Sequence, residues 1–189
     1  MMKKIIVTCA TREEFVQIDW PSAEIGHLLT GLGKTKSAYY LAEAIREQHP
    51  DLVINVGTAG TLHHKVGDIF VCRHFVDRDM QKLKDYGVSY EIELPEDALD
   101  FIPSCLYNNK GICNTGDTFL TEHENVAGDV IDMEAYAQAF VCQSMKVPFV
   151  AVKYVTDIVG QNSVEIWQDK LKDAVSALRT FLNHSPKTF

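Results

Sequence analysis

DLVINVGTAG, residues 51–60 of this 189-residue chain, has the pattern of a strand buried in a protein core. Leu, Val and Ile dominate its first six positions, and glycines follow at Gly57 and Gly60. A short apolar run that leads into a glycine-rich segment is typical of a buried strand followed by a turn. We therefore expect a core strand over 51–56 that ends at Gly57.

On both sides of this run, strand-like and helix-like segments alternate, which is typical of an α/β fold with a mostly parallel sheet. We expect further strands at 4–9, 25–30, 67–76, 111–114 and 149–155, with 88–94 as a candidate partner for 67–76. We expect helices before Pro50, within 95–106, at 133–145 and at 163–183. Because no repeat or linker interrupts the chain, we expect one domain over residues 1–189.

The composition argues against several classes of function. A formal net charge of −8 argues against nucleic-acid binding, which needs a basic surface. The five cysteines are scattered without zinc-ligand spacing, so we expect no metal site and reduced thiols in a cytoplasmic protein. The apolar run at 5–7 is too short for a secretory signal, and no stretch approaches the roughly 20 apolar residues that span a membrane.

Carboxylates recur where several of the expected strands end. Glu13 and Glu14 follow the first strand, Asp157 follows the last strand, and Glu134 stands at the start of a predicted helix. In open α/β sheets ligands bind beyond the carboxyl ends of the strands, so these side chains are candidates for one site. Each also has a structural interpretation, as a surface charge, a helix N-terminal carboxylate or an N-cap. Their joint occurrence favours a site.

Two glycine-rich segments allow a structural interpretation as well. Gly57 and Gly60 suit a tight turn after a strand. The segment Gly-Leu-Gly-Lys at 31–34 resembles part of a phosphate-binding loop, but it lacks the spacing Gly-x-x-x-x-Gly-Lys-[Ser/Thr]. We interpret it as the turn that begins a helix.

Five sequence blocks, in order along nearly the whole chain, resemble the superfamily of purine nucleoside phosphorylases and nucleosidases. They are NVGTAG at 55–60 followed by VGDI at 66–69, NTGDTF at 114–119, IDMEAYA at 131–137, VPF at 147–149 and KYVTD at 153–157. The later blocks resemble the 5′-methylthioadenosine/S-adenosylhomocysteine nucleosidases in particular. The resemblance implies a three-layer sandwich in which helices flank a central mixed, mostly parallel sheet.

The same resemblance implies a site for a purine nucleoside. Asp157 matches the acid that protonates or hydrogen-bonds purine N7. Glu14 matches the carboxylate that positions or activates the attacking water, with Glu13 as the reserve candidate. The matching substrate-binding positions are Thr58 and Gly60 for the ribose and water pocket, Phe119 and Leu120 for the purine, and Met133 and Glu134 for the sugar.

These residue types suit cleavage of the bond between C1′ and N9. An acid at N7 lets the purine leave as a neutral base, and burial can make that acid hold its proton more tightly than a free aspartic acid. The ribosyl centre becomes cationic, as in glycoside hydrolysis, where two carboxyl groups also divide the acid and water-handling roles. No cofactor or metal is required.

The nucleophile can be water or phosphate. Phosphorylases usually bind the phosphate dianion with arginine. In those that share this pattern, an arginine stands two residues before the glycine of the turn, where this chain has Asn55. Among its five arginines, Arg78 is the candidate to reach the pocket, although Asp77 and Asp79 flank it. We therefore expect an N-ribosyl hydrolase that acts on an adenine nucleoside. A phosphorylase and a non-catalytic nucleoside-binding protein are the alternatives.

The resemblance also implies a homodimer in which the partner subunit closes the 5′ side of the pocket. This chain is shorter than typical members between Met80 and Gly111. The 5′ substituent of the substrate therefore stays open, with methylthioadenosine, S-adenosylhomocysteine, futalosine-like and other adenine nucleosides as candidates.

Overall fold

The most deeply buried part of the chain is a parallel pair of strands, β3 (Leu52–Thr61) and β8 (Phe149–Ile158). The computed structural model describes residues 2–95, 103–120, 126–161 and 163–183, and nearly every residue of these two strands is buried. Strands covered on both faces consist of continuous apolar runs rather than alternating ones. This explains the sequences LVINV at 52–56 and FVAV at 149–152.

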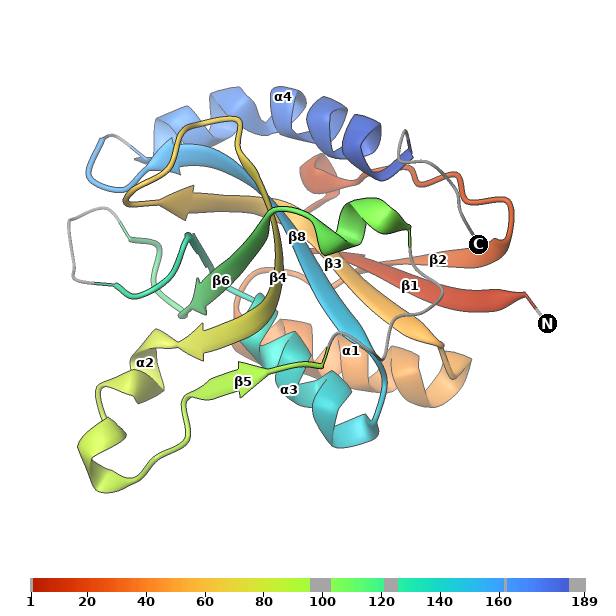
Figure 1. The fold of residues 1–189 in the computed structure, drawn as a ribbon, viewed down its shortest axis with the longest axis horizontal. Coiled ribbons are helices and arrows are strands. Elements are labelled where there is room, and N and C mark those ends of the chain that lie inside the picture. Colours follow the sequence, from red (N-terminus) through yellow and green to blue (C-terminus); the bar gives the residue numbers. More distant parts are fainter. Residues whose placement is uncertain (1, 96–102, 121–125, 162, 184–189) are drawn as a thin grey trace.

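The other strands extend this pair into one sheet (Figure 1). They are β1 (Lys3–Cys9), β2 (Ala23–Leu29), β4 (Ile69–Asp77), β5 (Glu91–Glu93), β6 (Lys110–Thr115) and β7 (Val130–Asp132). The order is β2-β1-β3-β7-β6-β4-β5, and β8 pairs with both β3 and β4, so that five of the strands close into a ring. Among the described residues, five strand pairings are parallel and three antiparallel, which confirms the predicted mixed, mostly parallel sheet.

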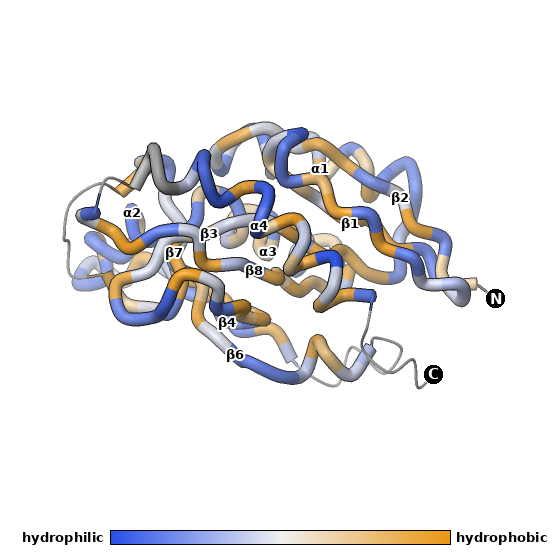
Figure 2. The backbone as a smooth tube through the Cα atoms, turned by 90° about the horizontal axis from the view of Figure 1, so that it is seen from above, coloured by the Kyte–Doolittle hydropathy of each residue, from blue (hydrophilic) through white to orange (hydrophobic). Residues whose placement is uncertain are grey.

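Helices cover both faces of this sheet and give the three layers that we predicted. In Figure 1, α1 (Lys34–Gln48) and α3 (Ala135–Met145) lie on one side and α4 (Ser163–Asn183) on the other. Figure 2 shows hydrophilic and hydrophobic segments alternating along α4. Its buried residues Ala174, Leu178 and Leu182 are four positions apart and therefore share the face that packs on the sheet.

Short elements complete the chain. They are α2 (Arg78–Gln81) and the 3-10 helices η1 (Arg12–Glu14), η2 (Lys84–Tyr86) and η4 (Ser104–Tyr107). Across the described ranges, every helix lacks the combination of length and apolar character that crossing a bilayer requires.

Most predicted elements are confirmed to within a few residues, including the pairing of β5 with β4, which is antiparallel in the structure. The predicted end of the central strand is wrong, because β3 continues through Gly57 and Gly60 to Thr61, with a bulge at Ala59 and Gly60. β7 was not predicted, since three residues are too few to show a pattern. Of the helix expected within 95–106, residues 96–102 lie outside the described residues and η4 occupies the end.

Candidate active site

One cavity, of about 240 Å³, brings together eight residues that the sequence predicted for the site. It lies beyond the carboxyl ends of β1, β3, β6, β7 and β8, the edge where ligands bind in open α/β sheets. Its lining includes Glu14, Thr58, Gly60, Phe119, Leu120, Met133, Glu134 and Asp157. Glu13, the reserve candidate, is exposed and does not line the cavity.

Glu14 reaches the cavity from η1, the single turn that follows β1. This residue is only 6% exposed. Its Oε1 accepts hydrogen bonds from the backbone N–H of Thr58 at 2.9 Å and from the Thr58 hydroxyl at 2.6 Å. Its Oε2 accepts from the backbone N–H of Thr11 at 3.3 Å. Because both oxygens are bound by neighbouring groups, the carboxylate is held in one orientation.

The two glycines of β3 make room for acidic side chains. A Cβ at Gly57 would lie 3.2 Å from Oε1 of Glu14, and a Cβ at Gly60 would lie 3.1 Å from Oδ2 of Asp157. Both distances are shorter than an ordinary van der Waals contact. The interpretation of these glycines as a turn is therefore wrong. They let the strand backbone pass directly beside two carboxyl groups.

Asp157 lies near the end of β8, paired with Gly60 at the bulge in β3. It is 3% exposed, and its Oδ1 accepts a hydrogen bond from the hydroxyl of Thr156 at 2.8 Å. Its Oδ2 lies on the side of Gly60, which also lines the cavity. A buried carboxyl group thus forms part of the cavity wall.

Glu134 is the N-cap residue of α3 and is 6% exposed. Its Oε1 accepts a hydrogen bond from the backbone N–H of Gly33 at 2.9 Å. Burial, together with the nearby charge of Asp132, raises the pKa of Glu134 to about 7. The 31–34 segment begins α1 as predicted, and it also holds a carboxyl group of the site.

Asp132 and Lys153 form a buried ion pair beside the cavity, with 2.8 Å between Oδ2 and Nζ. Asp132 also accepts from the hydroxyl of Thr115 at 2.6 Å and from the backbone N–H of Ala135 at 2.9 Å. Burial alone would lower the pKa of Lys153, but the charge of Asp132 outweighs it and the net shift is upward. Burial opposes ionisation of Asp132 as well, yet the charge of Lys153 holds its pKa below the ordinary value.

Phe119 provides an aromatic wall. It follows β6, is 36% exposed, and makes an edge-on contact with Trp167, with 6.4 Å between ring centroids. Leu120 and Met133 add apolar surface to the same cavity. Trp167 also lines the cavity, and its indole N–H donates to the hydroxyl of Thr58 at 2.8 Å. Trp167 was not among the predicted site residues, and it lies in the helix that we predicted at 163–183.

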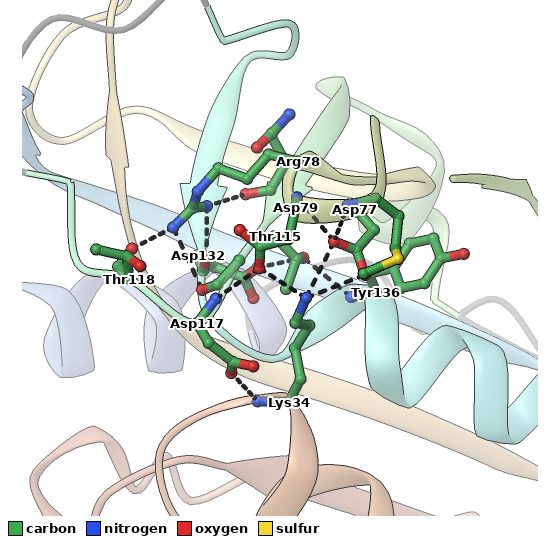
Figure 3. A network of polar contacts seen from close by, with 12 residues as sticks. Lys34, Asp77, Arg78, Asp79, Thr115, Asp117, Thr118, Asp132 and Tyr136 are labelled. Atoms are coloured by element: carbon green, nitrogen blue, oxygen red, sulfur yellow. Dashed lines mark hydrogen bonds and ion pairs between the residues drawn. The ribbon is translucent and has the colours of Figure 1, made fainter. Parts of the chain in front are cut away.

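Arg78 lines the cavity and is 6% exposed, as expected of the one arginine able to reach it. Figure 3 shows its guanidinium bound to the main chain around the site. Nη1 donates to the carbonyls of Asn114 at 3.4 Å and Asp132 at 3.2 Å. Nη2 donates to the carbonyls of Gly116 at 3.3 Å and of Thr118. Arg78 therefore ties the segment before Phe119 to the end of β7.

Lys34, the first residue of α1, is bound by carboxylates in the same network (Figure 3). Its Nζ lies 3.0 Å from Asp77 and 2.7 Å from Asp79, and its backbone N–H donates to Asp117 at 2.7 Å. The lysine of the apparent phosphate loop thus joins α1 to the segments after β4 and β6. In the part of the chain that the structure describes, no cluster of His, Cys, Asp and Glu could hold a metal ion.

Comparison with known proteins places this chain in a family. The family model described as the phosphorylase superfamily matches residues 10–185. A 5′-methylthioadenosine/S-adenosylhomocysteine nucleosidase of Bacillus velezensis is 30% identical, over 79% of this chain and 75% of that protein.

Solved structures of Helicobacter pylori proteins have the same fold. Its 5′-methylthioadenosine/S-adenosylhomocysteine nucleosidase has a TM-score of 0.82 at 20% identity and covers 96% of both chains. Its futalosine hydrolase also has a TM-score of 0.82 at 20% identity, with the same coverage. The chain therefore belongs to the phosphorylase superfamily, in the group that includes the 5′-methylthioadenosine/S-adenosylhomocysteine nucleosidases.

Proposed function

We propose that this protein hydrolyses the N-glycosidic bond of an adenine nucleoside of the methylthioadenosine/S-adenosylhomocysteine type. The observation that carries the proposal is the convergence of Glu14, Glu134 and Asp157 on one cavity from three separate segments. The relative at 30% identity is named as a nucleosidase for these two substrates, which supports the same reaction class here.

Asp157 acts on the leaving group. A purine that departs as an anion is a poor leaving group, whereas a proton delivered to N7 lets it leave neutral. Asp157 suits this role because it is buried at the cavity wall with one oxygen already bound by Thr156. The proton then ends on the free base.

Glu14 acts on the water. With its carboxylate fixed by Thr58 and Thr11, Glu14 accepts a hydrogen bond from the water and directs the water oxygen toward C1′. The new C1′–O bond replaces the C1′–N9 bond, and the proton that the water loses passes to the carboxylate of Glu14. The sugar is thus released with a hydroxyl group at C1′.

Glu134 and Met133 hold the ribose, and Phe119 with Leu120 holds the purine. A carboxylate accepts hydrogen bonds from the vicinal hydroxyls of a ribose, and Met133 packs against the apolar face of the ring. Stacking of a base on an aromatic ring contributes about 1–3 kcal/mol, which suits Phe119 as the main purine contact.

The positions of the cations support water over phosphate. Asn55, where related phosphorylases carry arginine, is 2% exposed, and its amide donates to the hydroxyl of Thr8 inside the core. Arg78 donates to four carbonyls, Lys34 binds two aspartates and Lys153 binds Asp132. A phosphate dianion needs several donors that are directed into the cavity, and these cations are already bound to oxygen atoms of the protein.

A homodimer is a further part of the proposal. Leu32 lines the cavity and is nevertheless 51% exposed, so the cavity has an open apolar edge that a partner subunit can cover. Light scattering coupled to size exclusion should give twice the chain mass of 21.2 kDa, and a monomer would contradict this part.

The test is base release from methylthioadenosine, S-adenosylhomocysteine, adenosine and futalosine in phosphate-free buffer. We expect adenine release that Asp157→Asn reduces at least about 100-fold, the lower range of general acid catalysis. Glu13→Gln, at the exposed neighbour of Glu14, should leave the rate unchanged. Dependence on phosphate would favour the phosphorylase, and binding of adenine without turnover would favour the non-catalytic nucleoside-binding protein.

A further inference from the structure

Trp167 links the two halves of the cavity through one side chain. Its indole N–H donates to the hydroxyl oxygen of Thr58 at 2.8 Å, and its ring meets the edge of Phe119. Thr58 in turn bonds Oε1 of Glu14 at 2.6 Å.

The direction of these hydrogen bonds follows from the chemistry of the groups. An indole N–H can only donate, and a hydroxyl has a single proton to give. Because Trp167 donates to the oxygen of Thr58, the proton of that hydroxyl is directed to the other neighbour, Oε1 of Glu14. The Thr58 backbone N–H donates to the same Oε1 at 2.9 Å. Trp167 thus fixes which way the hydroxyl of Thr58 points.

We propose that Trp167 is a positioning residue, which sets the place of the Glu14 carboxylate through Thr58 and the tilt of Phe119 through its ring. The inference rests on the proposed hydrolysis. Without the indole N–H, the hydroxyl of Thr58 can rotate away and share its proton between Glu14 and the cavity water. Glu14 then loses its fixed distance to the attacking water, and the rate of bond cleavage falls while nucleoside binding persists.

The first experiment separates the N–H from the ring. Trp167→Phe keeps an aromatic ring against Phe119 and removes the donor. We expect kcat to fall about tenfold, the size expected when a hydrogen bond that orients a charged group is lost, with KM within about twofold of the wild type. Incorporation of β-(3-benzothienyl)alanine at position 167, which keeps the bicyclic shape and replaces N–H by sulfur, should give the same loss. Full activity of this analogue would assign the effect to shape and overturn the inference.

The second experiment tests the route through Thr58. If Trp167 acts only by way of that hydroxyl, Trp167→Phe should cost little further activity in a Thr58→Val background. Additive losses in the double variant would contradict the relay. Trp20→Phe is the matched control, because the N–H of Trp20 donates to the carbonyl of Leu182 at 2.9 Å in the core, away from the cavity. It should leave kcat unchanged.

The outcomes distinguish the two proposals. A wild-type protein that releases no base from any nucleoside of the panel would overturn the proposed function and, with it, the role of Trp167. A wild-type protein that releases base normally, with kcat unchanged by Trp167→Phe, would overturn the role of Trp167 alone.

Discussion

The ammonium group of Lys153 lies 2.8 Å from Oδ2 of Asp132, and the two side chains are only 2% and 1% exposed. Asp132 also accepts a hydrogen bond from the backbone N–H of Ala135. It thus fixes the start of α3, where Glu134 is the N-cap residue. The pair joins β8 to the last residue of β7, just before the start of α3. It thereby holds the carboxyl group of Glu134 at a fixed position relative to β8, the strand that carries Asp157.

Removal of one partner from this pair should destabilise the protein strongly. Lys153→Met leaves the carboxylate of Asp132 buried without its counter-charge, and breaking such a pair costs about 3–5 kcal/mol in the free energy of unfolding. The exposed pair of Lys170 and Asp173, at 3.0 Å, is the matched control. Lys170→Met should cost far less, because solvent and salt screen an exposed ion pair. Urea unfolding measures the free energy of unfolding of both variants. Equal losses would contradict the conclusion that Lys153 is the buried counter-charge of Asp132.

Glu134→Gln should change the pH dependence of stability. The folded-state pKa of Glu134, raised from 4.5 to about 7 chiefly by burial, means that folding favours its neutral form. The stability contributed by the neutral group is complete below pH 4.5 and is lost as the pH rises through 7. Relative to Glu134→Gln, the wild type should therefore lose up to about 3 kcal/mol over this range. The free energies of unfolding of the wild type and of Glu134→Gln, measured at pH 5 and pH 8, test this. The same difference between the two proteins at both pH values would contradict the prediction.

Arg78→Lys should weaken nucleoside binding. A guanidinium has donors spread over a planar fork, whereas an ammonium group concentrates three donors at one point and cannot reach four carbonyls. The segment before Phe119 should then move, and we expect KM to rise about tenfold, equivalent to roughly 1.4 kcal/mol. Arg179→Lys, on the exposed side of α4, is the control. An unchanged KM in Arg78→Lys would show that the position of Phe119 does not depend on Arg78.

Phe119→Ala should lower the affinity for adenine. Loss of one stacking contact worth about 1–3 kcal/mol corresponds to roughly a 5- to 150-fold increase in Kd. Phe140 on α3 is 55% exposed and outside the cavity, so Phe140→Ala should bind adenine as the wild type does. Isothermal titration with adenine measures both. If the two variants bind equally well, the purine is held by other residues.

The sequence predicted those features of the site that are local. A carboxylate beside the end of an apolar strand is visible without knowledge of the fold, and Glu14 and Asp157 are of this kind. The choice between Glu13 and Glu14 depends on which side chain the turn η1 points inward, and in the structure Glu14 is the buried one.

Features that depend on contacts between distant segments were not predictable. Lys153 belongs to an apolar strand sequence, and its partner comes from another strand. A lysine in such a run indicates that an acidic partner is buried beside it, but it does not identify the residue that supplies this partner. Gly57 and Gly60 look like a turn because the acidic groups that need the space are remote in sequence. Trp167 fits an apolar stripe, and only the fold brings its N–H to Thr58.

Hydrolysis in water enriched in oxygen-18, with phosphate present, identifies the nucleophile. If Glu14 directs water to C1′ while Asp157 protonates the base, mass spectrometry of the sugar product should find one labelled oxygen, at C1′, and no phosphate. An unlabelled sugar 1-phosphate would mean that phosphate attacks the sugar, and the roles assigned to Glu14 and to the bound cations would then be wrong.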